Sequence, residues 1–156
     1  MNKPTGGAKY LAASIFRQIP AEQVFNSAVE YMSSKRIDTD NAPGAIGPYS
    51  QAMVFKDLIF TSGQLPLDPA TQKIPGDIRE QARNSLGNVR AILESAGSGL
   101  DKVLKTTVYL TDMSDFLAVN EVYASFFVEP FPARSCLAVK TLPLGARVEI
   151  EAVAFL

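Results

Sequence analysis

The stretch DIREQARNSLGNVRAILESAG, residues 77–97, decides the fold class because it carries the strongest periodic pattern in the chain. It opens with Asp77-Ile78-Arg79-Glu80, which has the form of a capping box with Asp at the N-cap. Gly97 is a natural C-terminal stop. Apolar residues between these signals recur at intervals of three or four: Ile78, Ala82, Leu86, Val89, Leu93 and Ala96. The spacing predicts an amphipathic helix that ends before Gly97.

Strand patterns lie on both sides of this helix. Before it, residues 52–55 and 58–62 read as two strands around a Lys56-Asp57 turn. After it, residues 103–110 are rich in β-branched side chains and predict a third strand. Residues 134–142 and 147–155 predict the last two strands, joined as a hairpin through Pro143-Leu144-Gly145-Ala146.

A second helix is predicted between the third strand and the final pair. Ser114 or Asp112 caps it, and its buried face includes Phe116, Val119, Tyr123 and Phe126. Two strands before each helix and a final hairpin indicate a layered α+β domain, with a mixed sheet and two helices on one face. The other face of the sheet then needs cover, which a homo-oligomer can provide.

Residues 1–34 form an N-terminal extension to this domain, which we place at 35–156. Up to Ala21 the extension carries Lys3, Lys9 and Arg17 with no acid, which is typical of a weak mitochondrial targeting segment. From Pro20 onward, apolar residues at helical spacing instead favour an amphipathic helix docked on the domain. The sequence leaves both interpretations open.

Composition narrows the chemistry. A chain of 156 residues with 47% apolar and 20% charged residues suits one globular domain, and no apolar run is long enough for a membrane helix. The net charge of −1 shows no basic excess of the kind that nucleic-acid binding favours. The absence of histidine excludes a His-assisted nucleophile, and a single cysteine excludes an internal disulfide and a Cys-rich zinc site. We therefore expect chemistry without a metal ion, using Glu, Asp, Tyr, Lys or a positioned water.

Arg134 is the only charge between Pro130 and Val139. A guanidinium is always ionised, and its planar fork of donors matches a carboxylate. Among apolar neighbours it needs an anionic partner. That partner is either a protein carboxylate or the carboxylate of a small ligand, and the spacing alone does not decide between them.

Glu149 and Glu151 share one face of the last predicted strand with Arg147. The pattern favours a solvated face on which Arg147 supplies the counter-charge. A hairpin turn near Leu144 would place Arg134 and Glu149 about 20 Å apart along the two strands. A site that uses both groups would therefore need two subunits or a strongly bent sheet.

Other candidates each have an ordinary structural interpretation beside the functional one. Tyr49 lies on a proline-stiffened loop and is either a packing ring or a site hydroxyl. Gly63, after Ser62, marks a bulge or the close approach of a ligand. Asn120 is a surface or site amide, and Cys136 is typical of an inert buried thiol.

Taken together, these stretches resemble the Rid family of RidA/YjgF-type reactive-intermediate deaminases. The resemblance runs in order over residues 36–156. The matching segments are Asn41-Ala42-Pro43 through Gly47-Pro48-Tyr49-Ser50-Gln51-Ala52, Thr61-Ser62-Gly63-Gln64, Val119-Asn120-Glu121-Val122-Tyr123, Phe131-Pro132-Ala133-Arg134-Ser135-Cys136 and Val148-Glu149-Ile150-Glu151-Ala152.

The resemblance implies a chorismate-mutase-like α+β fold, assembled as a homotrimer with clefts between subunits. It also implies hydrolysis of 2-imino acids and enamines, such as 2-aminoacrylate, to 2-keto acids and ammonia, without a cofactor. By position, Arg134 would bind the substrate carboxylate, Glu149 would activate water, and Tyr49 would bind near the imine nitrogen. Ser62, Gly63, Asn120 and the backbone of Cys136 would line the cleft.

Two other functions compete with this one. A trimer of the same form could bind 2-keto acids without catalysis, as a regulator. An endoribonuclease or translation inhibitor is the second, and the near-zero net charge weighs against it. For the deaminase no nucleic-acid or membrane partner is expected, and the predicted location is the cytoplasm, or the mitochondrion if residues 1–31 act as a transit segment.

Overall fold

The computed structural model describes Pro20, Glu22 and residues 33–156. The chain divides into two units, Met1–Ser33 and Ser34–Leu156, and the second unit contains a sheet and the helices that pack on it. The predicted targeting segment and the alternative docked helix fall almost wholly outside the described residues.

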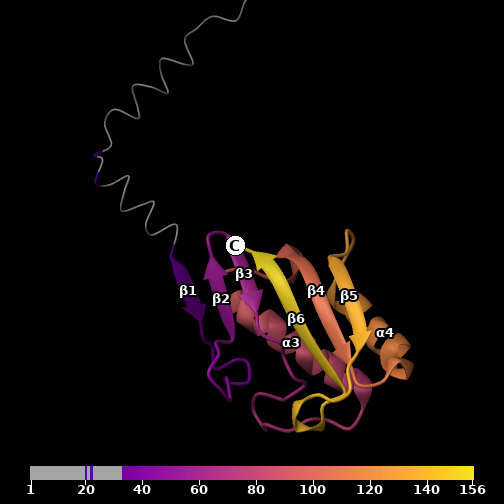
Figure 1. Ribbon diagram of the computed structural model, residues 1–156. Helices are drawn as coiled ribbons and strands as arrows, with labels where there is room; N and C mark the ends of the chain where they lie inside the picture. The colour runs from indigo at the N-terminus through magenta and orange to yellow at the C-terminus, as the bar shows by residue number, and fades with distance from the viewer. Residues whose placement is uncertain (1–19, 21, 23–32) are drawn as a thin grey trace, which may run out of the picture. The chain divides into compact units, whose positions relative to one another are not determined.

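A six-stranded sheet carries two α-helices of the described region on one face (Figure 1). Its strand order is β1-β2-β3-β6-β4-β5, and every neighbouring pair is antiparallel except β4 and β5, which are parallel. The predicted α+β class, with a mixed sheet and two helices on one face, is confirmed. The elements are β1 (Ser34–Ile37), β2 (Ala52–Phe55), β3 (Leu58–Thr61), α3 (Ile78–Ser95), β4 (Val103–Leu110), α4 (Phe116–Phe126), β5 (Ala133–Ala138) and β6 (Val148–Phe155).

The predicted final hairpin is wrong, because β4 lies between β5 and β6. The chain leaves β4, passes through α4 and returns parallel to β4, and a helical crossover of this kind gives parallel neighbours. A short 3₁₀ turn (Pro143–Gly145) then leads into β6 on the other side of β4. The prediction of two strands before each helix is also wrong. Three strands precede α3, because the short and exposed β1 gave no clear apolar pattern, and the one strand between α3 and α4 is β4.

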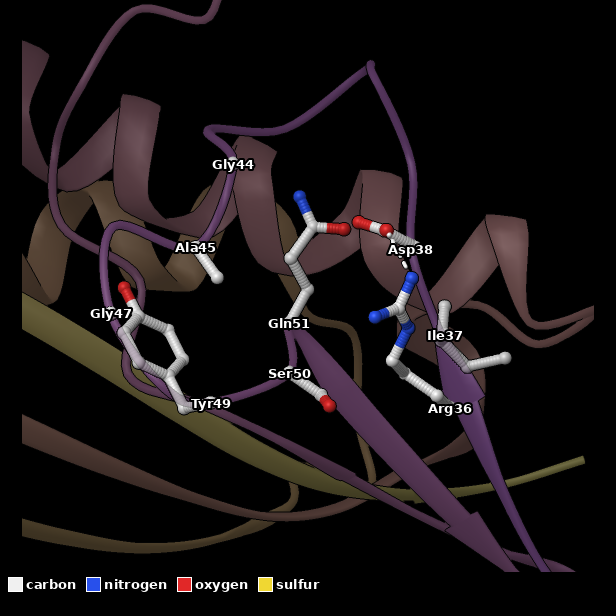
Figure 2. A pocket seen from close by; sticks show the side chains of 9 residues that line it. All are labelled: Arg36, Ile37, Asp38, Gly44, Ala45, Gly47, Tyr49, Ser50 and Gln51. Atoms are coloured by element: carbon white, nitrogen blue, oxygen red, sulfur yellow. Dashed lines mark hydrogen bonds and ion pairs between the residues drawn. The ribbon is translucent and has the colours of Figure 1, made fainter.

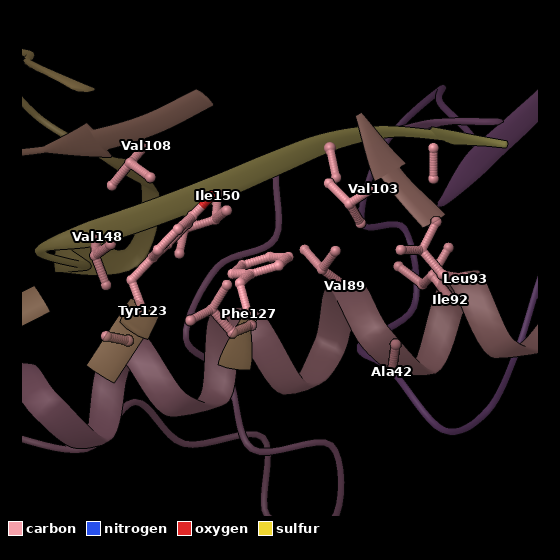
Figure 3. Packing of buried hydrophobic residues seen from close by; sticks show 14 of the residues in the cluster. Ala42, Val89, Ile92, Leu93, Val103, Val108, Tyr123, Phe127, Val148 and Ile150 are labelled. Carbon is pink, nitrogen blue, oxygen red and sulfur yellow. The ribbon is translucent and has the colours of Figure 1, made fainter. Parts of the chain in front are cut away.

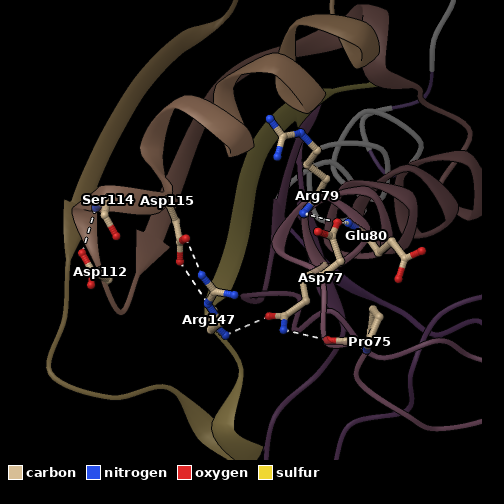
Figure 4. Close-up of polar contacts among 9 residues, drawn as sticks. Pro75, Asp77, Arg79, Glu80, Asp112, Ser114, Asp115 and Arg147 are labelled. Atoms are coloured by element: carbon tan, nitrogen blue, oxygen red, sulfur yellow. Dashed lines mark hydrogen bonds and ion pairs between the residues drawn. The ribbon is translucent and has the colours of Figure 1, made fainter.

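Helix α3 forms as its end signals predict. The Asp77 carboxylate accepts hydrogen bonds from the backbone N–H groups of Arg79 (2.9 Å) and Glu80 (3.1 Å), as Figure 4 shows. At the other end Gly97 has a φ of +86°, a conformation that suits glycine. Its N–H donates to the carbonyl of Glu94, and Ser98 donates to that of Leu93, so the helix ends in a Schellman motif.

The core lies between the two helices and the sheet. Val89, Ile92 and Leu93 of α3 are fully buried on the side of the helix where Val103 of β4 lies, whereas Ile150 of β6 lies beside Tyr123 of α4 (Figure 3). Burying each such aliphatic side chain contributes about 1.5–3 kcal/mol. The predicted alternation of β6 is confirmed, with this face formed by Val148, Ile150, Ala152 and Ala154.

The opposite face of the sheet carries large apolar side chains that remain exposed. Phe55, Leu58 and Phe155 lie in one row across β2, β3 and β6, and Phe60 lies in a neighbouring row. No described element covers them. Contiguous exposed apolar surface of this kind marks an interaction face.

Candidate functional site

Arg134 lies on the edge strand β5, opposite Thr106 of β4. Thr106 is buried toward the helices, and paired residues share a face, so Arg134 projects on the helix-covered side. Its guanidinium carbon lies 4.6 Å from the ring centroid of Tyr123 and 5.7 Å from that of Phe116. Among the described residues, the ion pairs involve other arginines, and no carboxylate pairs with Arg134.

A pocket of about 260 Å³ opens beside Arg134. It is lined by Asn120, Tyr123, Ala124, Phe131, Pro132 and Arg134. Two of the predicted site residues, Arg134 and Asn120, therefore face one cavity, although they come from β5 and α4. The aromatic floor was not singled out as part of the site from sequence, where Tyr123 read only as a core position of its helix.

Cys136 follows Arg134 by two residues on the same face of β5 and is half-buried. Burial raises the pKa of its thiol, and the positive charge of Arg134 partly opposes that rise. The side chain is therefore a neutral thiol at physiological pH, in line with the predicted inert character.

Glu149 belongs to β6 and lies opposite Tyr109 of β4, on the face away from the helices. Its carboxylate packs directly on Gly63. A Cβ built on Gly63 would lie 1.9 Å from Oε1 and 2.7 Å from Cδ of Glu149. The close approach predicted at Gly63 is thus made in this chain by the side chain of Glu149, and any larger residue would displace the carboxylate.

The surroundings of Glu149 favour its protonated form. Burial raises its pKa, and the neighbouring charge of Glu151 raises it further. The Tyr109 hydroxyl donates to Oε1 of Glu151 at 3.2 Å. A partly desolvated carboxyl with a raised pKa is suited to taking up and returning a proton.

The predicted role of Arg147 as counter-charge to Glu149 and Glu151 is wrong. Arg147 precedes β6, so its side chain does not follow the strand alternation. Its guanidinium forms a bidentate ion pair with Asp115 (Figure 4), and the backbone N–H of Arg147 donates to Oε1 of Gln81 at 2.9 Å.

The loop that carries Tyr49 is fixed beside Ser62. The Ser62 hydroxyl donates to the carbonyl of Ser50 at 2.7 Å, and its N–H donates to the carbonyl of Gln51 at 2.9 Å. Tyr49 is half exposed, and its hydroxyl accepts a hydrogen bond from the N–H of Ile46 at 3.3 Å. It lines a second cavity of about 380 Å³ (Figure 2).

Gln51 is a polar residue that sequence reasoning missed. It is 2% exposed, and its side chain extends toward the preceding loop (Figure 2). Its amide accepts from the N–H of Thr39 at 2.7 Å and donates to the carbonyls of Thr39, at 3.0 Å, and Pro43, at 2.9 Å. The sequence signal for this buried amide is a glutamine directly before the apolar strand β2.

The predicted site residues thus do not meet in one place, and Tyr49 lines a cavity that contains neither Arg134 nor Glu149. Asn120, Arg134 and Cys136 belong to the helix-covered side of the sheet, whereas Glu149 lies on the open side against Gly63. Arg134 is level with Ala152 across β4, so it lies about 10 Å along and about 10 Å across the sheet from Glu149, rather than 20 Å along a hairpin. In one copy of the chain the two groups do not share a cavity.

Within the described residues, no group of three or more His, Cys, Asp or Glu side chains is placed to hold a metal ion. No helix there has the length and apolar character needed to cross a membrane. The charged groups available for chemistry are the guanidinium of Arg134, which contacts aromatic rings, and the partly buried carboxylate of Glu149.

These features define a small α+β protein whose charged site groups come from both faces of one sheet. A family model described as Endoribonuclease L-PSP matches residues 39–156, and the chain belongs to this family. The resemblance seen in the sequence motifs is confirmed.

Named relatives and solved structures agree with this assignment. The chain is 56% identical over 118 residues to the RutC family protein y4sK of Sinorhizobium fredii, covering 75% of this chain and 94% of the relative. It is 50% identical over 124 residues to the 2-iminobutanoate/2-iminopropanoate deaminase of Escherichia coli K12, covering 78% and 97%. The crystal structure of E. coli TdcF with bound serine is similar with a TM-score of 0.75 and 48% identity, over 78% of this chain and 98% of that one.

Proposed function

We propose that this protein hydrolyses 2-imino acids and their enamine tautomers to 2-keto acids and ammonia. The E. coli relative that is half identical over nearly its whole length is named as a deaminase of 2-iminobutanoate and 2-iminopropanoate. The structure of E. coli TdcF holds serine, a small molecule with a carboxylate beside a nitrogen-bearing carbon. Both comparisons favour a small carboxylate ligand for this chain.

The observation that carries the proposal is the setting of Arg134. It lines a small pocket with Asn120, rests on the rings of Tyr123 and Phe116, and forms no ion pair with a carboxylate of the described residues. A guanidinium in this state binds a ligand carboxylate through two charge-assisted hydrogen bonds. Such a clamp also orients the adjacent imine carbon for attack.

The proposed reaction needs only water and a proton carrier. Glu149 takes a proton from water as the oxygen attacks the imine carbon, and the C=N bond becomes a single bond in a tetrahedral aminoalcohol. That proton passes to nitrogen to complete the aminoalcohol. Glu149 then takes the hydroxyl proton and passes it to the nitrogen, so that the C–N bond breaks and ammonia leaves as the carbonyl of the keto acid forms. Tyr49 binds near the nitrogen, while Ser62, Gly63 and the backbone of Cys136 line the cleft.

We further propose that the working unit is a homotrimer with its sites between subunits. Two features support this assembly: the exposed apolar row of Phe55, Leu58 and Phe155, and the placement of Arg134 and Glu149 on opposite faces. A cleft between copies brings the carboxylate clamp of one to the proton carrier of the next.

The test is release of keto acid from freshly generated 2-aminoacrylate, with wild type and Arg134→Ala compared at equal concentration. Wild type should accelerate the release, and Arg134→Ala should lose that acceleration while keeping its fold. Equal rates for the two proteins would refute the assignment. If wild type binds 2-ketobutyrate but gives no turnover, the non-catalytic binding function replaces ours.

A ribonuclease is not favoured, although the family description names one. Nucleic-acid affinity rests on many contacts between phosphates and Lys or Arg side chains, and a net charge of −1 shows no excess of these basic residues.

The domain boundary and the location are also proposals. We place the deaminase domain at 35–156 and the protein in the cytoplasm, with the mitochondrion as the alternative if residues 1–31 serve as a transit segment. Mass spectrometry of the native N-terminus decides between them, since a cleaved segment would shorten the chain.

A further inference from the structure

Arg134 is held by its neighbours in a way that leaves its hydrogen-bond donors available. The Tyr123 ring lies against the guanidinium, 4.6 Å from its carbon to the ring centroid. A cation–π contact uses the face of the aromatic ring, which offers no carboxylate oxygen to the five N–H donors of the guanidinium. An acidic side chain would neutralise the charge and occupy the donors, but an aromatic ring does neither.

Tyr123 is itself fixed from two sides. It is 5% exposed, and its ring packs on Phe127 with centroids 4.5 Å apart. Its hydroxyl is hydrogen-bonded to that of Thr106, with 2.8 Å between the oxygens. Thr106 is 1% exposed and is the residue opposite Arg134 in the sheet. The arginine, its strand partner and the tyrosine therefore form a closed set of contacts across β5, β4 and α4.

We infer that Tyr123 is a positioning residue, which holds the guanidinium of Arg134 in place without neutralising its charge, so that it can bind the carboxylate of the substrate. The inference rests on the proposed function. An arginine side chain has a large rotamer entropy, and a rigid floor removes part of it before the ligand arrives. Phe116, at 5.7 Å, is the weaker second support.

The experiment measures the Kd of 2-ketobutyrate by calorimetry and the KM and kcat of imine turnover. Tyr123→Leu should raise the Kd and KM about 3- to 30-fold, because the cation–π support is lost, while kcat changes little. Tyr123→Phe keeps the ring and should restore a Kd close to that of wild type.

Phe126→Leu is the matched control. This ring belongs to the same helix but lies over Arg90, 5.8 Å from its guanidinium carbon, so the Kd should not change. Size-exclusion chromatography and thermal unfolding show which variants keep the fold. If Tyr123→Leu does not fold, Phe116→Leu decides, and a Kd raised about two- to threefold supports the inference.

An unchanged Kd in Tyr123→Leu, or in Phe116→Leu when that variant decides, would overturn the inference if Arg134→Ala has lost binding. A lower kcat with an unchanged KM would also overturn it, because that pattern indicates general damage to the site. Failure of the proposed function looks different: wild type would bind 2-ketobutyrate, with the same order among the variants, but would release no keto acid from the imine.

Discussion

Arg134 and Glu149 project from opposite faces of one sheet, with β4 between their strands. Arg134 pairs with Thr106, which faces the helices, whereas Glu149 pairs with Tyr109, which faces away. Rotation of side chains cannot bring both groups to one ligand in a single copy, because the packed sheet separates them. If both act on one substrate, the site is made by two copies of the chain.

Gly63→Ala should disable Glu149 with little effect on folding. The new Cβ would overlap the Glu149 carboxylate, which is the flexible end of a side chain and can move away. We expect a loss of about 10- to 100-fold in kcat, since a displacement of about 1 Å at a proton carrier costs this much. The free energy of unfolding should fall by less than about 1 kcal/mol.

Gly76→Ala is the control for this substitution, because a Cβ there meets nothing within 4 Å. It should leave turnover and unfolding close to those of wild type. If Gly63→Ala were as active as Gly76→Ala, the contact between Gly63 and Glu149 would have no part in catalysis.

The pH dependence of turnover should report Glu149. Burial and then Glu151 raise its pKa, and activity should fall as the pH drops through that pKa, because the protonated carboxyl cannot accept a proton from water. Glu151→Gln removes the repulsion and should move the acid limb of kcat to lower pH.

The other group that faces Glu149 from a neighbouring strand, Tyr109, does not interfere with this limb. Burial, and then Glu151, raises the pKa of Tyr109, so it stays neutral over the same pH range. Because the pKa of Glu149 is raised in the folded protein, its protonation stabilises the fold at low pH. This contribution to the free energy of unfolding is lost as the pH rises through the raised pKa. An acid limb unmoved in Glu151→Gln would show that another group controls the profile.

Asp115→Asn should destabilise the fold by about 1–3 kcal/mol, measured by urea unfolding. The Asp115 side chain is 8% exposed and holds Arg147 through two hydrogen bonds, so its loss leaves a partly buried guanidinium without its carboxylate. Asp38→Asn breaks a pair whose side chains are more than 60% exposed and should cost less than about 1 kcal/mol. Equal effects of the two substitutions would contradict this account of the Arg147 pair.

Elements with local signals were predictable from the sequence. Helix α3 has its N-cap at Asp77, its Schellman stop at Gly97 and a buried stripe between them, all set by residues within a few positions of each other. The alternation of β6 was equally local. The sequence also identified Arg134 and Asn120 as candidate site residues, although only the fold shows that they line one pocket.

Relations between distant segments were not predictable in this way. The placement of β6 on the far side of β4 depends on the crossover through α4, and no turn signal near Leu144 records it. Arg147 could be assigned to the wrong partners because its true partner, Asp115, is 32 residues away. The aromatic support of Arg134 was hidden because Tyr123 also has an ordinary place in the core.

Mixing two inactive variants tests the central claim most directly, which is that one active site is built from opposite faces of two copies. Arg134→Ala and Glu149→Gln chains, unfolded together and reassembled in equal amounts, should regain about a quarter of wild-type activity, because a random pairing places an intact Arg134 beside an intact Glu149 in one site of four. Each variant reassembled alone should stay inactive. A mixture no more active than the separate variants would contradict the account.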